Sequence, residues 1–432
     1  MTHSNPAALV PGEVPKQPER PRLREIMGPG LITGASDDDP SGIATYSQAG
    51  ALFGYALGWT LVLTWPLMCA IQIISADIGR VTGRGLAGNL RLHYPRSLLH
   101  LLVGLLIFAN TLNIGADLGA MAAALRLLVP GPPLLYVGGF ALLCTGLEVF
   151  LRYARYVSVL KWLTLSLFAY VATVAVVGLP WRAALGALVI PHVQWHADYL
   201  TMIVAVFGTT ISPYLFFWQA GEEVEDMNER PGGMALTEDP AAAPHELSRI
   251  RMDTVIGMGF SNLVALCILW TTAATLHAHG IGAIATAADA AAALRPLAGP
   301  FAFALFALGI IGTGLLTVPV LAGSAAYAIG EAWHWPIGLA RRPGQARAFY
   351  LTIAAATLLG GLMNVIGLDP VQALIWSAVV NGIVAVPIMA MMMLMVVRAD
   401  IMGRFVARPW LRGLGWLATI VMGAAVLGMA AS

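Results

Sequence analysis

Long apolar runs separated by short polar connections make up most of the chain. A transmembrane helix needs about 20 predominantly apolar residues. Eleven segments meet this requirement: 27–54, 56–79, 98–129, 134–150, 158–180, 199–220, 253–277, 300–330, 348–366, 371–397 and 411–430. They predict an all-α membrane protein with one transmembrane domain over 27–432. The first, third and eighth are long enough to tilt, break or extend beyond the bilayer, and only 221–251 is a sizeable polar insert.

The composition supports lipid as the solvent of this domain. Of 432 residues, 58% are hydrophobic and 11% charged, whereas soluble domains carry roughly 25% charged residues. The mean hydropathy is +0.76. A net charge of +1 argues against a nucleic-acid partner, and no feature points to an obligate protein partner. Three cysteines are too few for a disulfide framework.

Basic residues predict the orientation in the membrane. All but three of the 24 Lys and Arg residues fall in segments that lie on the same side as the N-terminus; the exceptions are Arg126, Arg182 and Arg295. Cytoplasmic loops carry the excess of Lys and Arg. We therefore expect a cytoplasmic N-terminus, an outside C-terminus and a multi-pass protein of the bacterial inner membrane. Residues 1–26 lack the pattern of a signal peptide and predict a disordered cytoplasmic tail.

The first apolar segment contains the run D-D-D-P-S-G at 37–42 near its middle. Three carboxylates at the bilayer centre would cost roughly 8–10 kcal/mol even on the lenient insertion scale. Pro40 removes a backbone donor and Gly42 permits unwinding. Carbonyls freed in this way must face protein or water rather than lipid. We therefore predict that this helix is broken at a binding site.

The sixth segment has a matching interruption, G-T-T-I-S-P-Y at 208–214. The two interruptions occupy equivalent places in two five-helix halves, which we assign to 27–180 and 199–398 with an extra helix at 411–430. Broken helices at corresponding positions indicate an inverted-repeat transporter with its site at the bilayer midplane. The predicted fold is therefore a LeuT-type 5+5 inverted repeat with eleven transmembrane helices.

Oxygen atoms dominate the predicted site. A carboxylate, unwound carbonyls and hydroxyls suit a hard divalent cation, bound as transported substrate and not as a cofactor; the residues are Asp39, Gly42, Thr209, Thr210, Ser212 and Asn381. An organic amine or a sodium-coupled solute could use the same groups. Asn381 could instead form an interhelical hydrogen bond.

Other polar residues have two interpretations each. Asp37 and Asp38 either line the approach to the site or cap the half-helix. Asp117 is either a proton or ion relay or a structural hydrogen-bonding group. The spacing of Asp77 with Arg80, and of Glu148 with Arg152, predicts surface ion pairs.

Several separated stretches resemble the NRAMP divalent-metal transporter family. The run G-P-G-L-I-T-G-A-S-D-D-D-P-S-G-I-A-T-Y-S-Q-A-G at 28–50 resembles its first helix with the Asp-Pro-Gly-Asn break. The stretch I-G-R-V-T-G-R-G-L-A-G-N-L-R-L-H-Y-P at 78–95 is similar to its loop after helix two, and 300–323 resembles its eighth helix. The resemblance implies a LeuT-type fold and alternating-access import of divalent metal.

The departures from the family pattern concern the site itself. The helix-one Asp of the family falls on Asp39, but its Asn falls on Gly42. Its helix-six Met-Pro-His becomes Ser212-Pro213-Tyr214, which removes a thioether that favours transition metals and a His associated with proton movement. Its acidic pair in helix three falls on Asp117 and Ala120.

These changes are similar to those of the NRAMP-related magnesium transporters. They predict import of Mg²⁺, Mn²⁺ or both with weak or no proton coupling. The alternatives are an ordinary proton-coupled Mn²⁺ or Fe²⁺ symporter, a sodium-coupled solute symporter on the same fold, and a passive cation channel. An intramembrane enzyme would need Asp39 and Asp117 in contact as a dyad, and we expect a transporter, not an enzyme.

Overall fold

The computed structural model describes residues 29–150, 167–230 and 232–432, which are helical with short connections and contain no strand. Within them, nine helical segments are long and apolar enough to cross a membrane. The first predicted helix is not among the nine; it is split into the pieces Pro29–Asp37 and Pro40–Phe53. The predicted tail 1–26 and the first nine residues of the predicted helix 158–180, residues 158–166, lie outside the described residues.

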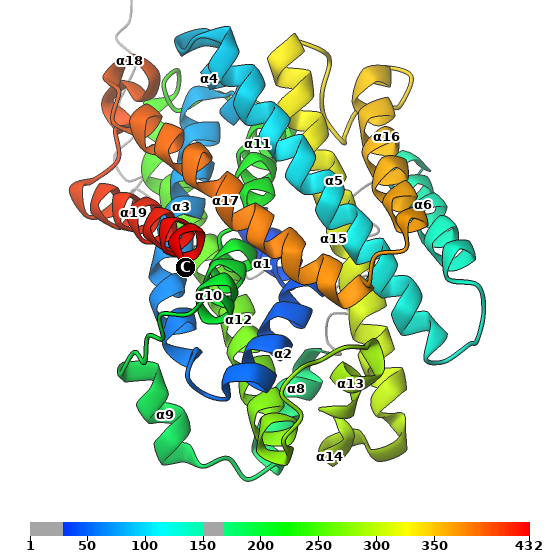
Figure 1. The fold of residues 1–432 in the computed structure, drawn as a ribbon. Helices are drawn as coiled ribbons and strands as arrows, with labels where there is room; N and C mark the ends of the chain where they lie inside the picture. Colours follow the sequence, from blue (N-terminus) through cyan, green and yellow to red (C-terminus); the bar gives the residue numbers. More distant parts are fainter. Residues whose placement is uncertain (1–28, 151–166, 231) are drawn as a thin grey trace, which may run out of the picture.

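The first half of the chain contains seven described helices, drawn from blue to green in Figure 1. Their bounds are α1 Pro29–Asp37, α2 Pro40–Phe53, α3 Gly58–Thr82, α4 Leu86–His93, α5 Arg96–Arg126, α6 Pro133–Phe150 and α8 Phe168–Val176. A short helix α9, Trp181–Val189, precedes the second half.

The second half repeats the order of a broken helix followed by long helices. Its elements are α10 Ala197–Thr210, α11 Pro213–Glu229, α12 Ala243–Thr275, α13 Ala287–Ala292, α14 Arg295–Ala298, α15 Ala302–Trp333, α16 Arg347–Met363 and α17 Pro370–Val396. Two further helices, α18 Ala399–Met402 and α19 Pro409–Ala431, complete the chain. The broken first and sixth helices are thus confirmed, whereas the third and eighth, α5 and α15, run unbroken.

The pieces of the first broken helix lie inside the bundle (Figure 1). α1 packs against α12, and α2 packs against α5, α10, α12 and α17. A side chain at Gly34 of α1 would overlap the carbonyl of Gly257 of α12. The two backbones therefore touch, and a residue without Cβ is required at this crossing.

Two expectations about the predicted cytoplasmic side are wrong. The polar segment 221–251 is not a long loop, because α11 continues to Glu229 and α12 already begins at Ala243. Arg80 does not pair with Asp77; it donates a hydrogen bond of 3.2 Å to Glu246 and another of 3.1 Å to the carbonyl of Met234. Arg80 thus forms an ion pair with a neighbouring helix and not along its own helix, and this pair stabilises the charged end of α12.

Glu148 is buried on α6, and neither of its carboxylate oxygens has a hydrogen-bond partner within the described part of the chain. Its predicted partner Arg152 lies outside that part. The predicted surface position of Glu148 is wrong.

Candidate ion-binding site

The break in the first helix is connected to the second half of the chain through one carbonyl. In a continuous helix the carbonyl of Ser36 would accept from the N–H of residue 40, but Pro40 has none. The hydroxyls of Tyr214 and Thr317 donate to this carbonyl at 3.1 and 3.2 Å. Tyr214 therefore joins the second broken helix to the first, a structural contact that the sequence did not predict.

The second break follows the same rule. Pro213 cannot donate to the carbonyl of Thr209, and the hydroxyl of Ser212 lies 3.0 Å from that oxygen and 2.8 Å from the carbonyl oxygen of Gly208. The hydroxyl of Thr210 donates to the carbonyl of Val206 at 2.9 Å. The hydroxyls of Ser212 and Thr210 thus donate their protons to backbone carbonyls, and only their oxygen lone pairs remain for other groups.

Asp39 is the N-cap of α2 and is 2% exposed. Its Oδ1 accepts from the N–H of Gly42 at 2.5 Å, and its Oδ2 accepts from Nδ2 of Asn113 at 3.1 Å. Gly42 lies in the first turn of α2, so within the predicted run 37–42 the break is confined to positions 38 and 39. The carboxylate of Asp39 is therefore held at the break, with one donor on each oxygen.

Asp37 and Asp38 face α12 at the end of α1. The hydroxyl oxygen of Ser261 on α12 lies 2.6 Å from Oδ2 of Asp37 and 3.1 Å from Oδ1 of Asp38. Both carboxylates are buried. These contacts tie the end of α1 to α12, while a role in ion access stays a prediction.

α10 and α17 meet α2 next to Asp39. A Cβ on Gly42 would lie 3.1 Å from the hydroxyl oxygen of Thr209, so the two breaks face each other. Asn381 lies on α17, one turn beyond Ser377, and is buried. Its Oδ1 has no hydrogen-bond partner among the described residues. The structure thus brings Asp39, Gly42 and Thr209 together and leaves the Asn381 oxygen available.

Asp117 lies on α5, one turn beyond Asn113, and is fully buried. Neither of its carboxylate oxygens has a hydrogen-bond partner in the described segments. It is not hydrogen-bonded to Asp39, whose oxygens accept from Gly42 and Asn113. In the described residues, Asp39 and Asp117 are thus not joined by a direct hydrogen bond.

Sequence reasoning did not assign the residues that connect these elements. Asn113 accepts from the hydroxyl of Ser377 on α17 at 2.9 Å, and Ser377 lies 3.2 Å from the hydroxyl of Ser41 on α2. Ser41 also donates to the carbonyl of Leu374 at 2.8 Å. Their sequence signal is only that each is a polar residue in an apolar helix, which does not reveal its partner.

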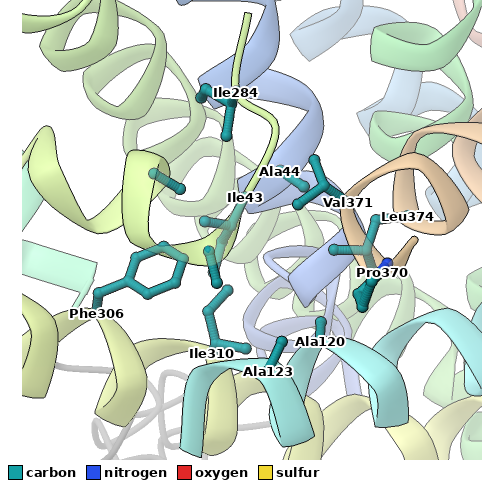
Figure 2. Close-up of a pocket in the computed structure, with 12 residues that line it drawn as sticks. Ile43, Ala44, Ala120, Ala123, Ile284, Phe306, Ile310, Pro370, Val371 and Leu374 are labelled. Atoms are coloured by element: carbon teal, nitrogen blue, oxygen red, sulfur yellow. The ribbon is translucent and has the colours of Figure 1, made fainter. Parts of the chain in front are cut away.

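A small cavity of about 30 Å³ adjoins the site (Figure 2). Apolar side chains from α2, α5, α13, α15 and α17 line it; they include Ile43, Phe306, Ile310 and Leu374. On α2 its lining begins at Ile43, two residues beyond Ser41. These side chains offer no ligand to a cation, so the cavity adds no polar group to the site.

The described residues contain no group of three or more His, Cys, Asp and Glu side chains that could hold a metal ion. Asp39 supplies a carboxylate at the break, the hydroxyl of Thr209 beside it is a neutral oxygen, and Asp117 is a further buried carboxylate one turn beyond Asn113 on α5. Such a set suits a hard cation that keeps part of its water shell.

The arrangement of two broken helices in two inverted five-helix repeats defines a membrane transporter of the LeuT type. In agreement, MhsT in complex with L-phenylalanine superposes with a TM-score of 0.61 at 14% identity over 93% of this chain and 98% of that one. The chain belongs to the natural resistance-associated macrophage protein-like (Nramp) family, whose model matches residues 30–432.

Its relatives include divalent metal cation transporters named MntH. That of Deinococcus radiodurans is 27% identical over 417 residues, with 93% of this chain and 88% of the relative covered. That of Klebsiella pneumoniae is 28% identical over 400 residues, 90% of each protein. A manganese transporter of Eremococcus coleocola superposes with a TM-score of 0.74 at 19% identity, covering 96% of this chain and 88% of the other.

Proposed function

We propose that the protein imports Mg²⁺, Mn²⁺ or both by alternating access, with weak or no proton coupling. The observation that carries this proposal is the position of Asp39, a buried carboxylate fixed at the break by Gly42 and Asn113. A single carboxylate among neutral oxygens binds a divalent cation without the cost of several adjacent like charges.

The residues of the second break support inclusion of Mg²⁺. Ser212 and Tyr214 stand where a thioether and an imidazole would favour softer transition metals. Neither break, at residues 37–42 and 208–214 of the described chain, contains His, Cys or Met. Serine and glycine also leave space for bound water, which Mg²⁺ usually retains.

Asp117 favours a second candidate, the proton-coupled Mn²⁺ or Fe²⁺ symporter. Its carboxylate is buried beside the site and has no described hydrogen-bond partner. Buried intramembrane carboxylates of this kind serve in proton relays. The two candidates differ in whether protons accompany the metal.

The proposed orientation defines the side of the membrane to which import delivers the metal. We infer a bacterial inner-membrane location with the N-terminus in the cytoplasm, because Lys and Arg are concentrated in the segments on that side. The surrounding partner is the lipid bilayer, and the bound metal is substrate and not a resident cofactor.

Uptake into proteoliposomes that contain a pH-sensitive dye tests the proposal. We expect uptake of Mg²⁺ and Mn²⁺, measured separately, without internal acidification. Acidification during Mn²⁺ uptake, with no Mg²⁺ uptake, would establish the proton-coupled alternative. Failure to transport either metal would contradict both.

The site assignment is tested with Asp39→Asn in the same assay. Loss of the carboxylate charge should abolish uptake of both metals while the purified protein stays folded. Asp289→Asn is a control, because Asp289 is a helix-capping carboxylate of α13 outside the site. Uptake retained by Asp39→Asn would contradict the assignment.

A further inference from the structure

We propose that Asn113 binds the transported cation directly through its side-chain oxygen. This inference rests on the proposed function and adds a ligand from α5. Gly42, in the first broken helix, provides no side-chain oxygen. Asn113 would supply an amide oxygen to the site from a different helix.

Two contacts fix the amide of Asn113 between α2 and α17. Nδ2 donates to Oδ2 of Asp39 at 3.1 Å, and Oδ1 accepts from the hydroxyl of Ser377 at 2.9 Å. Ser377 is also within 2.7 Å of the carbonyl of Leu374. Asn113 is fully buried, so its amide exchanges partners only within this network.

The hydroxyl protons permit a second arrangement of the same network. Ser41 and Ser377 each carry one hydroxyl proton. If Ser377 donates to Leu374 and Ser41 donates to Ser377, the Ser377 oxygen still has a lone pair for Nδ2 of Asn113. Rotation of the amide by a half-turn then directs Oδ1 toward Asp39 without loss of a hydrogen bond to Ser377.

A dication would select this second arrangement. Without an ion, the carboxylate of Asp39 favours the amide N–H, because two oxygens would repel each other. A dication between the two side chains reverses this preference, since both oxygens then face a positive charge. Amide carbonyls and carboxylates are ordinary ligands of hard divalent cations.

The separation of the two groups fits a shared ion. In an octahedral shell with metal–oxygen bonds of about 2.1 Å, adjacent ligands lie about 3.0 Å apart. The present distance between Nδ2 of Asn113 and Oδ2 of Asp39 is 3.1 Å. An inverted amide would place Oδ1 near the present position of Nδ2, where it forms one edge of such a shell with Asp39.

Binding of Mn²⁺ and Mg²⁺ to purified protein, measured by calorimetry, tests the role of Asn113. Asn113→Ala should weaken binding of each metal by roughly 10-fold or more. Asn110→Ala is a matched control, because Asn110 lies one turn earlier on α5, is equally buried and donates instead to Leu321 and Ser324 of α15. Equal affinities for Asn113→Ala and the unaltered protein would overturn the proposal.

A metal-exchange experiment separates a ligand from a residue that only orients Asp39. Asn113→Cys places sulfur at the ion, and thiolates select soft metals. The affinity for Cd²⁺ relative to Mg²⁺ should rise at least about 10-fold in Asn113→Cys and stay unchanged in Asn110→Cys. An unchanged Cd²⁺ preference in Asn113→Cys would show that this side chain does not contact the ion.

The unaltered protein and Asp39→Asn distinguish failure of this inference from failure of the proposed function. If the unaltered protein binds neither metal, the proposed function itself is wrong. If it binds metal, Asp39→Asn does not, and Asn113→Ala binds normally, only the assignment of Asn113 is wrong.

Discussion

Arg249 of α12 donates a hydrogen bond of 2.5 Å to Glu223 of α11, and the side chains are only 7% and 0% exposed. Glu246 of α12 accepts from Arg249 at 3.3 Å and from Arg80 of α3 at 3.2 Å. Three helices are therefore joined by buried charges at the predicted cytoplasmic end. Because each charge is removed from water, the loss of one leaves another without its counter-charge.

We predict that Arg249→Met lowers the stability of the folded protein by about 3–5 kcal/mol, the usual cost of breaking a buried ion pair from one side. The measurement is the thermal unfolding temperature of the purified protein in detergent. Arg398→Met is the control, because Arg398 pairs with Asp400 where both are exposed, and exposed pairs contribute little. Equal unfolding temperatures for the two variants would contradict the prediction.

Ser212 should set part of the metal preference. Its hydroxyl proton is directed at the backbone of α10, so it offers a cation only hard lone pairs. Ser212→Met should shift competition for uptake toward Mn²⁺ and Cd²⁺ relative to Mg²⁺, because a thioether is a softer ligand. Ser212→Ala removes the hydroxyl without adding sulfur and should not produce this shift. An unchanged ratio of Mg²⁺ to Mn²⁺ uptake in Ser212→Met would show that softness at this position is not decisive.

Much of the fold could be predicted because a bilayer imposes strong rules on sequence. The apolar runs mark the spans, and the prolines with polar neighbours mark both breaks. Helix ends were less predictable: α11 and α12 extend into a polar segment because Glu223 and Arg249 neutralise each other between helices. Such pairing depends on tertiary contacts and leaves no periodic pattern.

The packing of α10 against α17 should be essential for the second half of the site. A Cβ on Gly208 of α10 would overlap the carbonyl of Ala378 and approach the backbone of Gly382. Gly208→Ala should therefore displace Thr209 and reduce metal uptake markedly. Gly138→Ala, on the exposed side of α6 with no neighbouring atom within 4 Å of the new Cβ, should leave uptake unchanged. Normal uptake by Gly208→Ala would show that this contact can relax.

The site was predictable only in its local part. Asp39, Thr209 and Ser212 flank two prolines, so the sequence marks them. Asn113 and Ser377 lie 264 positions apart, and only the packing of α5 on α17 reveals that they share a hydrogen bond. The sequence pattern placed the first break within 37–42, and the structure narrows it to positions 38 and 39, because Asp39 caps α2 and Gly42 is already helical.

The last prediction concerns α4, which links α3 to α5 and hence to Asn113. The carboxylate of Glu331, at the end of α15, accepts from the N–H groups of Gly85 at 2.6 Å and Gly88 at 2.9 Å. These N–H groups belong to the start of α4, where a negative charge is favourable. Hydrogen bonds to a charged group contribute roughly 1.5–3 kcal/mol, so this contact should matter for the stability of the fold.

Glu331→Gln removes the charge and replaces one acceptor oxygen with a donor that faces an N–H group. We expect a lower thermal unfolding temperature, while the affinity for Mn²⁺ measured below that temperature stays unchanged, because Glu331 is not part of the ion site. Asp369→Asn is the control: Asp369 caps α17 through one exposed hydrogen bond to Gln372, and asparagine is an equally good cap. An unfolding temperature for Glu331→Gln equal to that of the control would mean that the charge of Glu331 contributes nothing, and that α4 is held in place by the packing of its apolar residues alone.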